Sequence, residues 1–370
     1  MKSEDVHSED VRDRLTAWWR TLMPDATDVR VEGLDRVEFG HSAEMLVLTL
    51  AWQADGTGHR ENLVVRLRPP APGLLEPYDL ERQFHILRAI EPTAVRAPRA
   101  RWFEGTGEVL GRPFYVMERL EGEVYERSVP DELADAPARI RQMSESLVDE
   151  LAAIHLVDLE ATGISSLGDG HAYVDRELAH WTDEMQRVQR GPLPALERLA
   201  AELRDRQPES SPTVTLVHGD AKPGNFAFVG DNVSAVFDWE MATVGDPLAD
   251  IGYLELMWGM RLGITSCPGC LTVDEFVARY QDRTGITVRH REWYRAFQGF
   301  KTAVILLLGA MLFDGGWSDD LRFVEMGAGV AWLTRSALRE LGIDERLESG
   351  PVTVREERVQ AVLEQAHSTS

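Results

Sequence analysis

The pattern of apolar and polar positions divides the chain into a strand-rich first third and a helical remainder. In the first third, apolar residues form short runs, and in the run 61–68 the two faces of a strand can be told apart by the period of two. These runs predict strands at 29–34, 45–52, 61–68 and 113–120. Apolar residues at helical spacing predict two helices here, at 8–22, which ends before Pro24, and at 79–90.

In the remainder, apolar residues recur every three or four positions, as on the buried face of a helix. The predicted helices cover 139–157, 172–187, 193–206, 251–262, 273–285, 289–312 and 319–341, with one more in the tail 348–370. Short apolar runs at 214–217, 226–229 and 233–237 predict three strands among these helices. The sequence therefore predicts an α+β protein with a β-rich first part and a mostly helical second part.

The candidate chemistry lies in the stretch 216–250. The first short strand leads to His218-Gly219-Asp220, and a hairpin that turns at 230–232 returns the chain to Asp238. A hairpin of this length can bring Asp238 back beside Asn225. Asp220 could then orient a hydroxyl group, while Asn225 and Asp238 offer the oxygen ligands that Mg²⁺ prefers. Phosphoryl transfer needs these groups. The alternative is a metal-free hairpin that carries surface acids.

The spacing Asp-x4-Asn, followed by an Asp after an apolar strand, resembles the catalytic core of the protein-kinase-like superfamily. The forms HGD at 218–220, DWE at 238–240 and GDP at 245–247 resemble the aminoglycoside phosphotransferase family. Eukaryotic protein kinases carry HRD, DFG and APE instead. The resemblance implies a two-lobe protein-kinase-like fold, with a small β-rich N-lobe at 1–117 and a larger, mostly helical C-lobe at 118–370. It also implies ATP and Mg²⁺ as cofactors.

Within the N-lobe, the stretch VVRLRPPAPG that begins at Val64 resembles a subgroup with arginine in place of the usual lysine. This subgroup includes the kinase-like domains fused to acyl-CoA dehydrogenases. The resemblance implies that Arg66 binds the α- and β-phosphates, with Arg68 as the second choice, and that Glu81 pairs with this cation. A solvated pair of arginines on an edge strand is the alternative. Backbone N–H groups at Gly40 and Ser42 could close over the phosphates.

Two further roles follow from the resemblance. The strand 113–120 resembles the hinge between kinase lobes, where Glu118 and Leu120 would bind adenine through their backbone groups. The form DxKPxN places Lys222 two residues after Asp220, where a cation could neutralise the γ-phosphoryl group. An exposed loop lysine is the alternative for Lys222. Asp250 is expected to steady the catalytic loop from inside the lobe.

Composition narrows the choice of partners and compartment. The chain has 370 residues, a formal net charge of −23 and a pI near 4.9, which argues against a nucleic-acid partner and an anionic membrane surface. The charged first 14 residues make secretion unexpected. The longest apolar run, 303–313, is too short to span a bilayer. We therefore expect a cytoplasmic protein.

Three side chains that could carry other chemistry are interpreted as structural. The two cysteines, Cys267 and Cys270, lie in a loop-like SCPGC stretch, and a zinc site would need a second pair of ligands. Two reduced thiols are expected, and a redox dithiol is the alternative. His155 lies on the apolar face of a predicted helix and is expected to be a core histidine.

The expected function is Mg²⁺-dependent transfer of the ATP γ-phosphoryl group to a hydroxyl of a small molecule. The acceptor could be an aminoglycoside-like antibiotic, a hydroxyacyl-CoA or another metabolite. Sequence does not decide among these, because acceptor residues lie on the variable C-lobe helices. A nucleotide-binding pseudokinase with a regulatory or scaffold role is the main alternative. Lys222-Pro223 also occurs in protein kinases, but no APE-type segment follows Asp238.

Overall fold

The computed structural model separates into two compact units, which are described one at a time. Unit 1 contains Met1–Gly122 and Ser234–Glu240, and unit 2 contains Glu123–Val233 and Met241–Ser370. The structure describes residues 8–37, 44–209, 211–260, 263–344, 347–350 and 355–368. The first boundary falls after residue 122 rather than 117, and the segment 234–240 returns to unit 1. Sequence order alone could not show that return.

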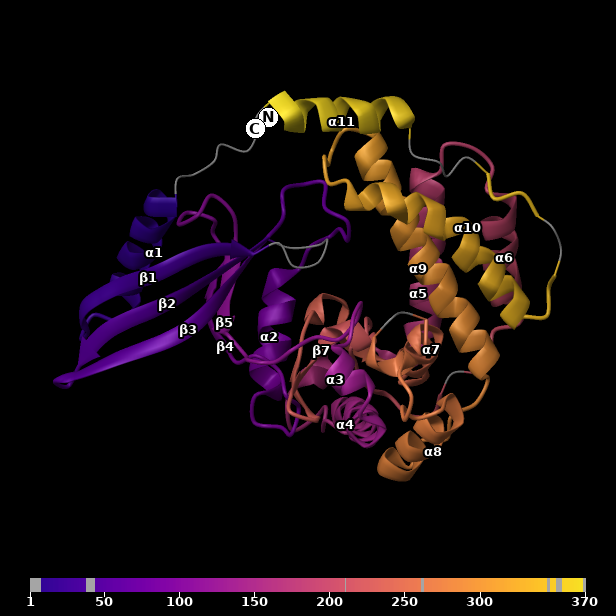
Figure 1. Ribbon diagram of the computed structural model, residues 1–370, viewed down its shortest axis with the longest axis horizontal. Coiled ribbons are helices and arrows are strands. Elements are labelled where there is room, and N and C mark those ends of the chain that lie inside the picture. The colour runs from indigo at the N-terminus through magenta and orange to yellow at the C-terminus, as the bar shows by residue number, and fades with distance from the viewer. Residues whose placement is uncertain are drawn as a thin grey trace. The chain divides into compact units, whose positions relative to one another are not determined.

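Unit 1 is built on a five-stranded antiparallel sheet with the order β1-β2-β3-β5-β4 (Figure 1). The strands are β1 (Thr27–Val37), β2 (Glu44–Ala54), β3 (Thr57–Leu67), β4 (Ala100–Glu104) and β5 (Phe114–Glu118). The predicted strands at 29–34, 45–52, 61–68 and 113–120 correspond to four of these. In the register of the central strands, Arg66 lies opposite Met45 on β2 and Tyr115 on β5.

Helix α1 (Ser8–Leu22), which matches the predicted range, packs against this sheet (Figure 1). Its fully buried Leu15 and Trp19 join Leu50, Val65 and Phe114 in one hydrophobic cluster. Burial of a side chain such as Leu15 contributes about 1.5–3 kcal/mol to folding. This cluster makes the sheet a rigid support for residues near the end of β3.

Helix α2 (Leu80–Ile90) also belongs to unit 1 and begins at the side chain of Asp79. The Asp79 carboxylate accepts the N–H of Arg82 at 2.9 Å, which satisfies one of the free amides of the first turn. The helix buries Gln83, Ile86 and Leu87. Its phase is therefore fixed both by the cap and by the buried face.

Unit 2 is mostly helical, as predicted. Its helices are α3 (Asp131–Ala134), α4 (Pro137–His155), α5 (Tyr173–Val188), α6 (Pro194–Asp205), α7 (Leu248–Met257), α8 (Val273–Thr284), α9 (Arg291–Asp314), α10 (Arg322–Glu340) and α11 (Glu356–Ser368). The single-turn 3-10 helices of the chain are η1 (Ile164–Leu167), η2 (Gly170–Ala172), η3 (Pro223–Asn225), η4 (Trp239–Met241) and η5 (Ile264–Ser266). Strands β6 (Thr215–Val217) and β9 (Thr243–Gly245) pair antiparallel, and β7 (Phe226–Val229) pairs with β8 (Asn232–Val236).

Helix α9 forms the centre of unit 2. By length and composition it is the one helix in the described part of the chain that could cross a membrane, but 78% of its apolar window is buried inside the protein. It packs against α5, α6, α7 and α10. We therefore interpret α9 as a core helix.

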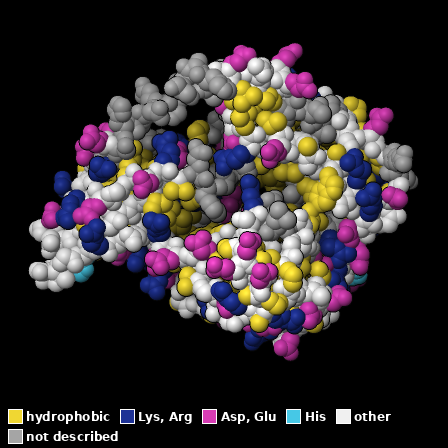
Figure 2. Space-filling view, in the orientation of Figure 1, with side chains coloured by type: hydrophobic (Ala, Val, Ile, Leu, Met, Phe, Trp, Pro, Cys, Tyr) yellow, Lys and Arg dark blue, Asp and Glu magenta, His cyan; other side chains and the backbone are white. Residues whose placement is uncertain are grey.

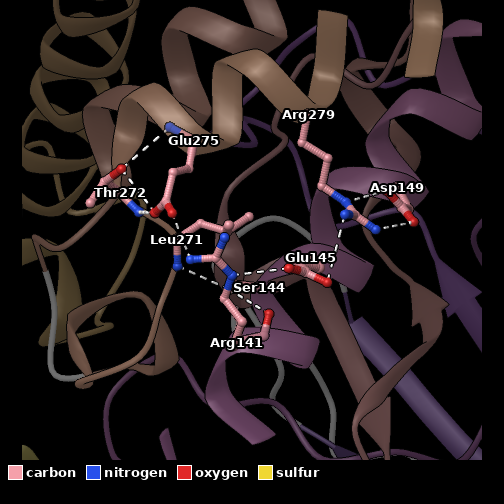
Figure 3. Close-up of polar contacts among 8 residues, drawn as sticks. All are labelled: Arg141, Ser144, Glu145, Asp149, Leu271, Thr272, Glu275 and Arg279. Atoms are coloured by element: carbon pink, nitrogen blue, oxygen red, sulfur yellow. Dashed lines mark hydrogen bonds and ion pairs between the residues drawn. The ribbon is translucent and has the colours of Figure 1, made fainter. Parts of the chain in front are cut away.

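Helices α4 and α8 are joined by charged side chains (Figure 3). Arg279 binds both carboxylate oxygens of Asp149 at 2.7 and 2.9 Å, and Arg283 does the same at 3.0 and 2.7 Å. Ser144 on α4 accepts the N–H of Leu271 at 3.1 Å, just before α8 begins. These contacts fix the loop that carries the two cysteines against α4.

Candidate active site

The loop between β6 and β7 carries the predicted catalytic residue and is held by the buried Asp250 on α7. The Asp250 carboxylate accepts the backbone N–H groups of His218 and Gly219 at 2.7 and 2.9 Å. Its Oδ2 also lies 3.1 Å from Nε2 of His155, which is buried and hydrogen-bonded to Tyr280 as a core histidine. The expectations for Asp250 and His155 are therefore confirmed.

The loop makes a close approach at Gly219, where a side chain would not fit. This residue has φ = +80°, and a Cβ atom would lie 2.5 Å from the carbonyl oxygen of Met241. The Gly219 carbonyl accepts a hydrogen bond at 2.8 Å from Nζ of Lys301, a lysine on α9 that is only 3% exposed. The backbone just before Asp220 is thus fixed from both sides. Sequence reasoning did not single out Lys301, because a lysine inside a helical pattern reads as a surface residue.

Asp220 is surrounded by groups that stabilise its carboxylate. Lys222 Nζ lies 3.1 Å from Oδ2, and Asn225 Nδ2 donates to the same oxygen at 2.8 Å. Burial alone would raise the pKa of Asp220, but the charges of Lys222 and His218 and the Asn225 hydrogen bond outweigh it and lower that pKa. Asp220 is therefore ionised at neutral pH and able to accept a hydrogen bond from a hydroxyl group.

Asn225 is buried and oriented by Asp220. Its Nδ2 donates to the Asp220 backbone oxygen at 2.7 Å as well as to the carboxylate. Since both donated bonds use the nitrogen, the Oδ1 atom is the one that could bind a metal ion. The structure thus brings together three of the predicted residues, Asp220, Lys222 and Asn225.

Helix α7 adds a tyrosine that sequence reasoning missed. Tyr253 lies close to Asp220 and to Thr302 of α9, and burial together with the Asp220 charge raises the pKa of Tyr253. It follows Asp250 by three residues, so both side chains lie on the same face of α7. The three-residue spacing from Asp250 was the sequence signal that could have identified Tyr253.

The second group of predicted residues lies in unit 1, where Arg66 is buried at the end of β3. Its Nη2 atom lies 3.0 Å from Oδ1 of Asp238 and 2.6 Å from Oε2 of Glu240. The Tyr78 hydroxyl donates to the same Glu240 oxygen. The Arg66 side chain is 5% exposed, whereas that of Arg68 is 41% exposed and lies 3.4 Å from Glu76. Of the two arginines, Arg66 is therefore the buried one, and its role as the phosphate-binding cation stays a prediction.

The charge of Arg66 is stabilised although the side chain is buried. Burial alone would lower the pKa of Arg66, but Asp238 and the other nearby groups raise it well above the ordinary value. Its Nε–H is buried and has no hydrogen-bond partner among the described residues. A buried donor without a partner costs about 1–3 kcal/mol, so a ligand oxygen that accepts this hydrogen would be favoured.

Asp238 adopts a backbone conformation that is uncommon for a residue with a side chain. Its φ is +63°, in the left-handed region, where a residue other than glycine costs on the order of 1–3 kcal/mol. Such strain clusters at functional sites. Asp238 lies two residues after the end of β8, and its carboxylate points to Arg66.

The expected pairing of Glu81 with Arg66 is wrong. The Glu81 side chain is 67% exposed, and its carboxylate lies 3.7 Å from Nε2 of His85, one helical turn along α2. The Asp79 cap and the buried face of α2 set a helix phase that points Glu81 to solvent. Glu240 takes the place of this acid at Arg66.

The predicted adenine contacts are only partly available. The Glu118 N–H donates to the Arg99 carbonyl at 2.9 Å, and the Arg119 N–H donates to the Asn62 carbonyl at 3.0 Å. The Glu118 amide is therefore already used inside unit 1, and a contact of adenine with the Glu118 carbonyl stays a prediction. The role of Leu120 stays a prediction, and Gly40 and Ser42 lie outside the described residues.

Among the described residues, no group of three or more His, Cys, Asp or Glu side chains could hold a metal ion by itself. Mg²⁺ does not require such a group, because it commonly binds one or two protein oxygens together with waters and phosphates. Asn225 and Asp238 each carry a side-chain oxygen of the kind it prefers. Their convergence with Asp220 on one ion stays a prediction.

Residues 49–297 match the model of the phosphotransferase enzyme family, which covers more than half of the chain. The chain belongs to this family. Curated relatives include the acyl-CoA dehydrogenase family member 10 of Mus musculus, 32% identical over 66% of this chain and 24% of the relative. The acyl-CoA dehydrogenase family member 11 of Rattus norvegicus is 30% identical over 65% of this chain and 32% of the relative. The chain thus spans about a quarter to a third of these relatives.

Solved structures confirm the kinase-like α+β fold of this phosphotransferase family member. A putative aminoglycoside phosphotransferase from Ralstonia eutropha aligns with a TM-score of 0.70 at 24% identity, over 89% of this chain and 98% of the other. A thermostable mutant of APH(4)-Ia, in a ternary complex with ADP and hygromycin B, aligns with a TM-score of 0.54 at 15% identity, over 88% of this chain and 98% of the other. At these identities the likeness shows the fold.

Proposed function

We propose that this protein is an ATP- and Mg²⁺-dependent phosphotransferase that moves the γ-phosphoryl group to a hydroxyl of a small molecule. The observation that carries the proposal is the assembled loop at 218–225. In it, the Asp220 carboxylate is ionised, bound by Lys222 and Asn225, and supported from behind by Asp250. Family membership independently favours phosphoryl transfer.

In this mechanism Asp220 accepts a hydrogen bond from the acceptor hydroxyl and aligns its oxygen with the γ-phosphorus. Because the pKa of Asp220 is lowered, it is a weak base and takes the proton only as the new O–P bond forms. The hydroxyl oxygen then bonds to phosphorus, and the bond to the ADP oxygen breaks. Lys222, already 3.1 Å from Asp220, is placed to offset charge on the transferred group.

Arg66 would hold the α- and β-phosphates. Its buried guanidinium keeps its charge, and the unpartnered Nε–H gives a phosphate oxygen a donor. Asn225 and Asp238 would hold magnesium, which supplies neutralisation of the phosphate charge when bound. Asp238 binds Arg66 in this structure, so a metal ion and Arg66 would compete for its carboxylate.

The acceptor is proposed only as a class. The proposed class is a small molecule with a hydroxyl group, such as an aminoglycoside-like antibiotic, a hydroxyacyl-CoA or another hydroxylated metabolite. The similarity to acyl-CoA dehydrogenase family members 10 and 11 suggests a hydroxyacyl-CoA as acceptor. The similarity to a solved antibiotic phosphotransferase suggests an antibiotic. On the face shown in Figure 2, acidic and basic side chains are interspersed.

The experiment is a screen of hydroxylated small molecules by coupled ADP release, with Mg²⁺ and ATP. Asp220→Asn is the test variant. Asp231→Asn is the matched control. Asp231 lies in the β7–β8 turn, is an acid with a similar side-chain exposure, and pairs with Arg139 of α4. We expect Asp220→Asn to lower turnover at least a hundredfold with little change in ADP affinity, and Asp231→Asn to leave turnover within about twofold.

A nucleotide-binding pseudokinase is the second candidate, favoured by the arginine at position 66 and by its pairing with Asp238. The same experiment separates the two. If wild-type protein binds ADP but hydrolyses and transfers no ATP with any acceptor, the pseudokinase is supported. If Asp220→Asn retains full turnover, the role of Asp220 is refuted.

A further inference from the structure

Arg66 is the buried cation of the proposed nucleotide site, and its position depends on the carboxylates around it. The Nη2 atom is shared between Asp238 at 3.0 Å and Glu240 at 2.6 Å. A buried guanidinium requires a counterion, because an uncompensated buried charge costs several kcal/mol. The two acids are not equivalent, and their differences assign them different tasks.

Asp238 is the more exposed acid and is the one proposed to bind metal. Its side chain is 21% exposed, whereas that of Glu240 is 8% exposed. A metal ion that binds Asp238 weakens its bond to Arg66. Glu240 would then be the carboxylate that keeps the guanidinium in place.

Glu240 is itself held in place by Tyr78. The Tyr78 hydroxyl donates to Oε2, the same Glu240 oxygen that binds Arg66, and Tyr78 is buried. The Tyr78 backbone N–H donates to Glu76 at 3.1 Å, and Glu76 accepts from Arg68 at 3.4 Å. The segment after β3 is thereby fastened back to the end of the strand that carries Arg66. This closed chain of contacts gives Glu240 one orientation.

We propose that Glu240, oriented by Tyr78, is the positioning acid for Arg66 and sets its affinity for nucleotide phosphates. In the resemblance to kinases this task belongs to the helix acid, here Glu81, which the structure places in solvent. Glu240 acts through Arg66 and does not touch the reacting atoms. The inference rests on the proposed function, since it assumes that Arg66 binds phosphates.

The test is the affinity for ADP, measured by calorimetry on the full chain, both with Mg²⁺ and in EDTA. Glu240→Gln keeps the size of the side chain and removes its charge, while Tyr78→Phe removes only the hydroxyl. Glu81→Gln is the matched control at the helix position. We expect Glu240→Gln to weaken ADP binding about tenfold under both conditions, which is about 1.4 kcal/mol. Tyr78→Phe should weaken it about threefold, and Glu81→Gln should leave it unchanged.

Three results would overturn the inference. A loss for Glu240→Gln that appears only with Mg²⁺ would make Glu240 a metal ligand. Unchanged binding for both Glu240→Gln and Tyr78→Phe, or a loss for Glu81→Gln, would remove its positioning role. If Glu240→Gln does not fold, Tyr78→Phe decides alone, because it leaves the ion pair intact.

The outcome for the wild type keeps this inference distinct from the proposed function. If wild-type protein binds no ADP, the nucleotide part of the proposed function fails. If wild-type protein binds ADP and the variants match it, only the role of Glu240 fails. ATP hydrolysis adds a second readout, since a positioning loss should raise the KM for ATP more than it lowers kcat.

Discussion

Replacement of Asp250 by asparagine tests whether the catalytic loop is held from inside unit 2. The Asp250 carboxylate accepts two backbone N–H groups, from His218 and Gly219, and its Oδ2 also contacts His155. Asparagine keeps one oxygen but presents an NH₂ group in place of the other. One buried N–H therefore loses its acceptor, and the negative charge is lost from all three contacts.

The magnitude follows from these contacts. A buried donor left without an acceptor costs about 1–3 kcal/mol. Removal of one member of a buried, hydrogen-bonded charged group costs about 3–5 kcal/mol in comparable cases. We therefore expect Asp250→Asn to lower the free energy of unfolding by about 3–4 kcal/mol at pH 7, a large part of the total of about 5–15 kcal/mol for a typical domain.

The assay is urea unfolding followed by tryptophan fluorescence. Asp274→Asn is the matched control, because Asp274 is an acid whose side chain is 90% exposed and that contacts Arg291 at 3.0 Å. A surface pair of this kind contributes about 0–1 kcal/mol. The loop should also lose its geometry, so ATP turnover of Asp250→Asn should fall at least tenfold while ADP affinity changes little.

The pH dependence of the loss gives a second check. Burial raises the pKa of Asp250, but the contacts with His155 and His218 outweigh it, and the folded-state pKa lies below the unfolded value. The carboxylate therefore contributes stability above its ordinary pKa of about 3.9, and that stability is lost as the pH falls through the lower folded value. The difference between wild type and Asp250→Asn should be constant from about pH 8 to pH 5. A difference below about 1 kcal/mol, or one that shrinks between pH 7 and pH 5, would refute the reasoning.

Three further predictions concern other parts of unit 2. Lys301→Met removes the donor to the Gly219 carbonyl, so turnover should fall at least tenfold with unchanged ADP affinity, measured by ADP release and calorimetry. Asp149→Asn removes the carboxylate that binds Arg279 (Figure 3) and also Arg283, and should lower the free energy of unfolding by at most about 1 kcal/mol, less at high salt. Burial raises the pKa of Cys270 to about 11, so its alkylation at pH 7.5 should be much slower than that of free cysteine and should accelerate toward pH 11.

The parts of the fold that sequence predicted well have long apolar patterns or clear breaks. The predicted helix at 8–22 and the predicted strand at 226–229 match the observed bounds of α1 and β7. Strand β4 was missed, because Ala100–Glu104 mixes charged and aromatic residues and contains no apolar run. Strand β9 has only three residues, too few to show a period. Both missed strands are defined by their pairing, β4 with β5 and β9 with β6, rather than by a pattern in their own sequence.

The same contrast holds in the site. Asp220, Lys222 and Asn225 lie within six residues, and local spacing was enough to predict that they act together. Glu240 lies 174 residues from Arg66 and Tyr78 lies 162 residues from Glu240. Their pairing arises only when the chain folds. Glu81 was chosen by its place on a helix, and the phase of α2 could not be read closely enough to see that it points outward.

The DWE sequence at 238–240 explains why two acids converge on one arginine nitrogen. In an extended strand the side chains of Asp238 and Glu240 would point to the same face and be separated by the length of two residues. Strand β8 ends at Val236, Asp238 has a left-handed φ, and η4 begins at the next residue. The turn allows both side chains to reach Nη2 of Arg66. The backbone strain, on the order of 1–3 kcal/mol, is offset by the ion pairs of Asp238 and Glu240 with Arg66.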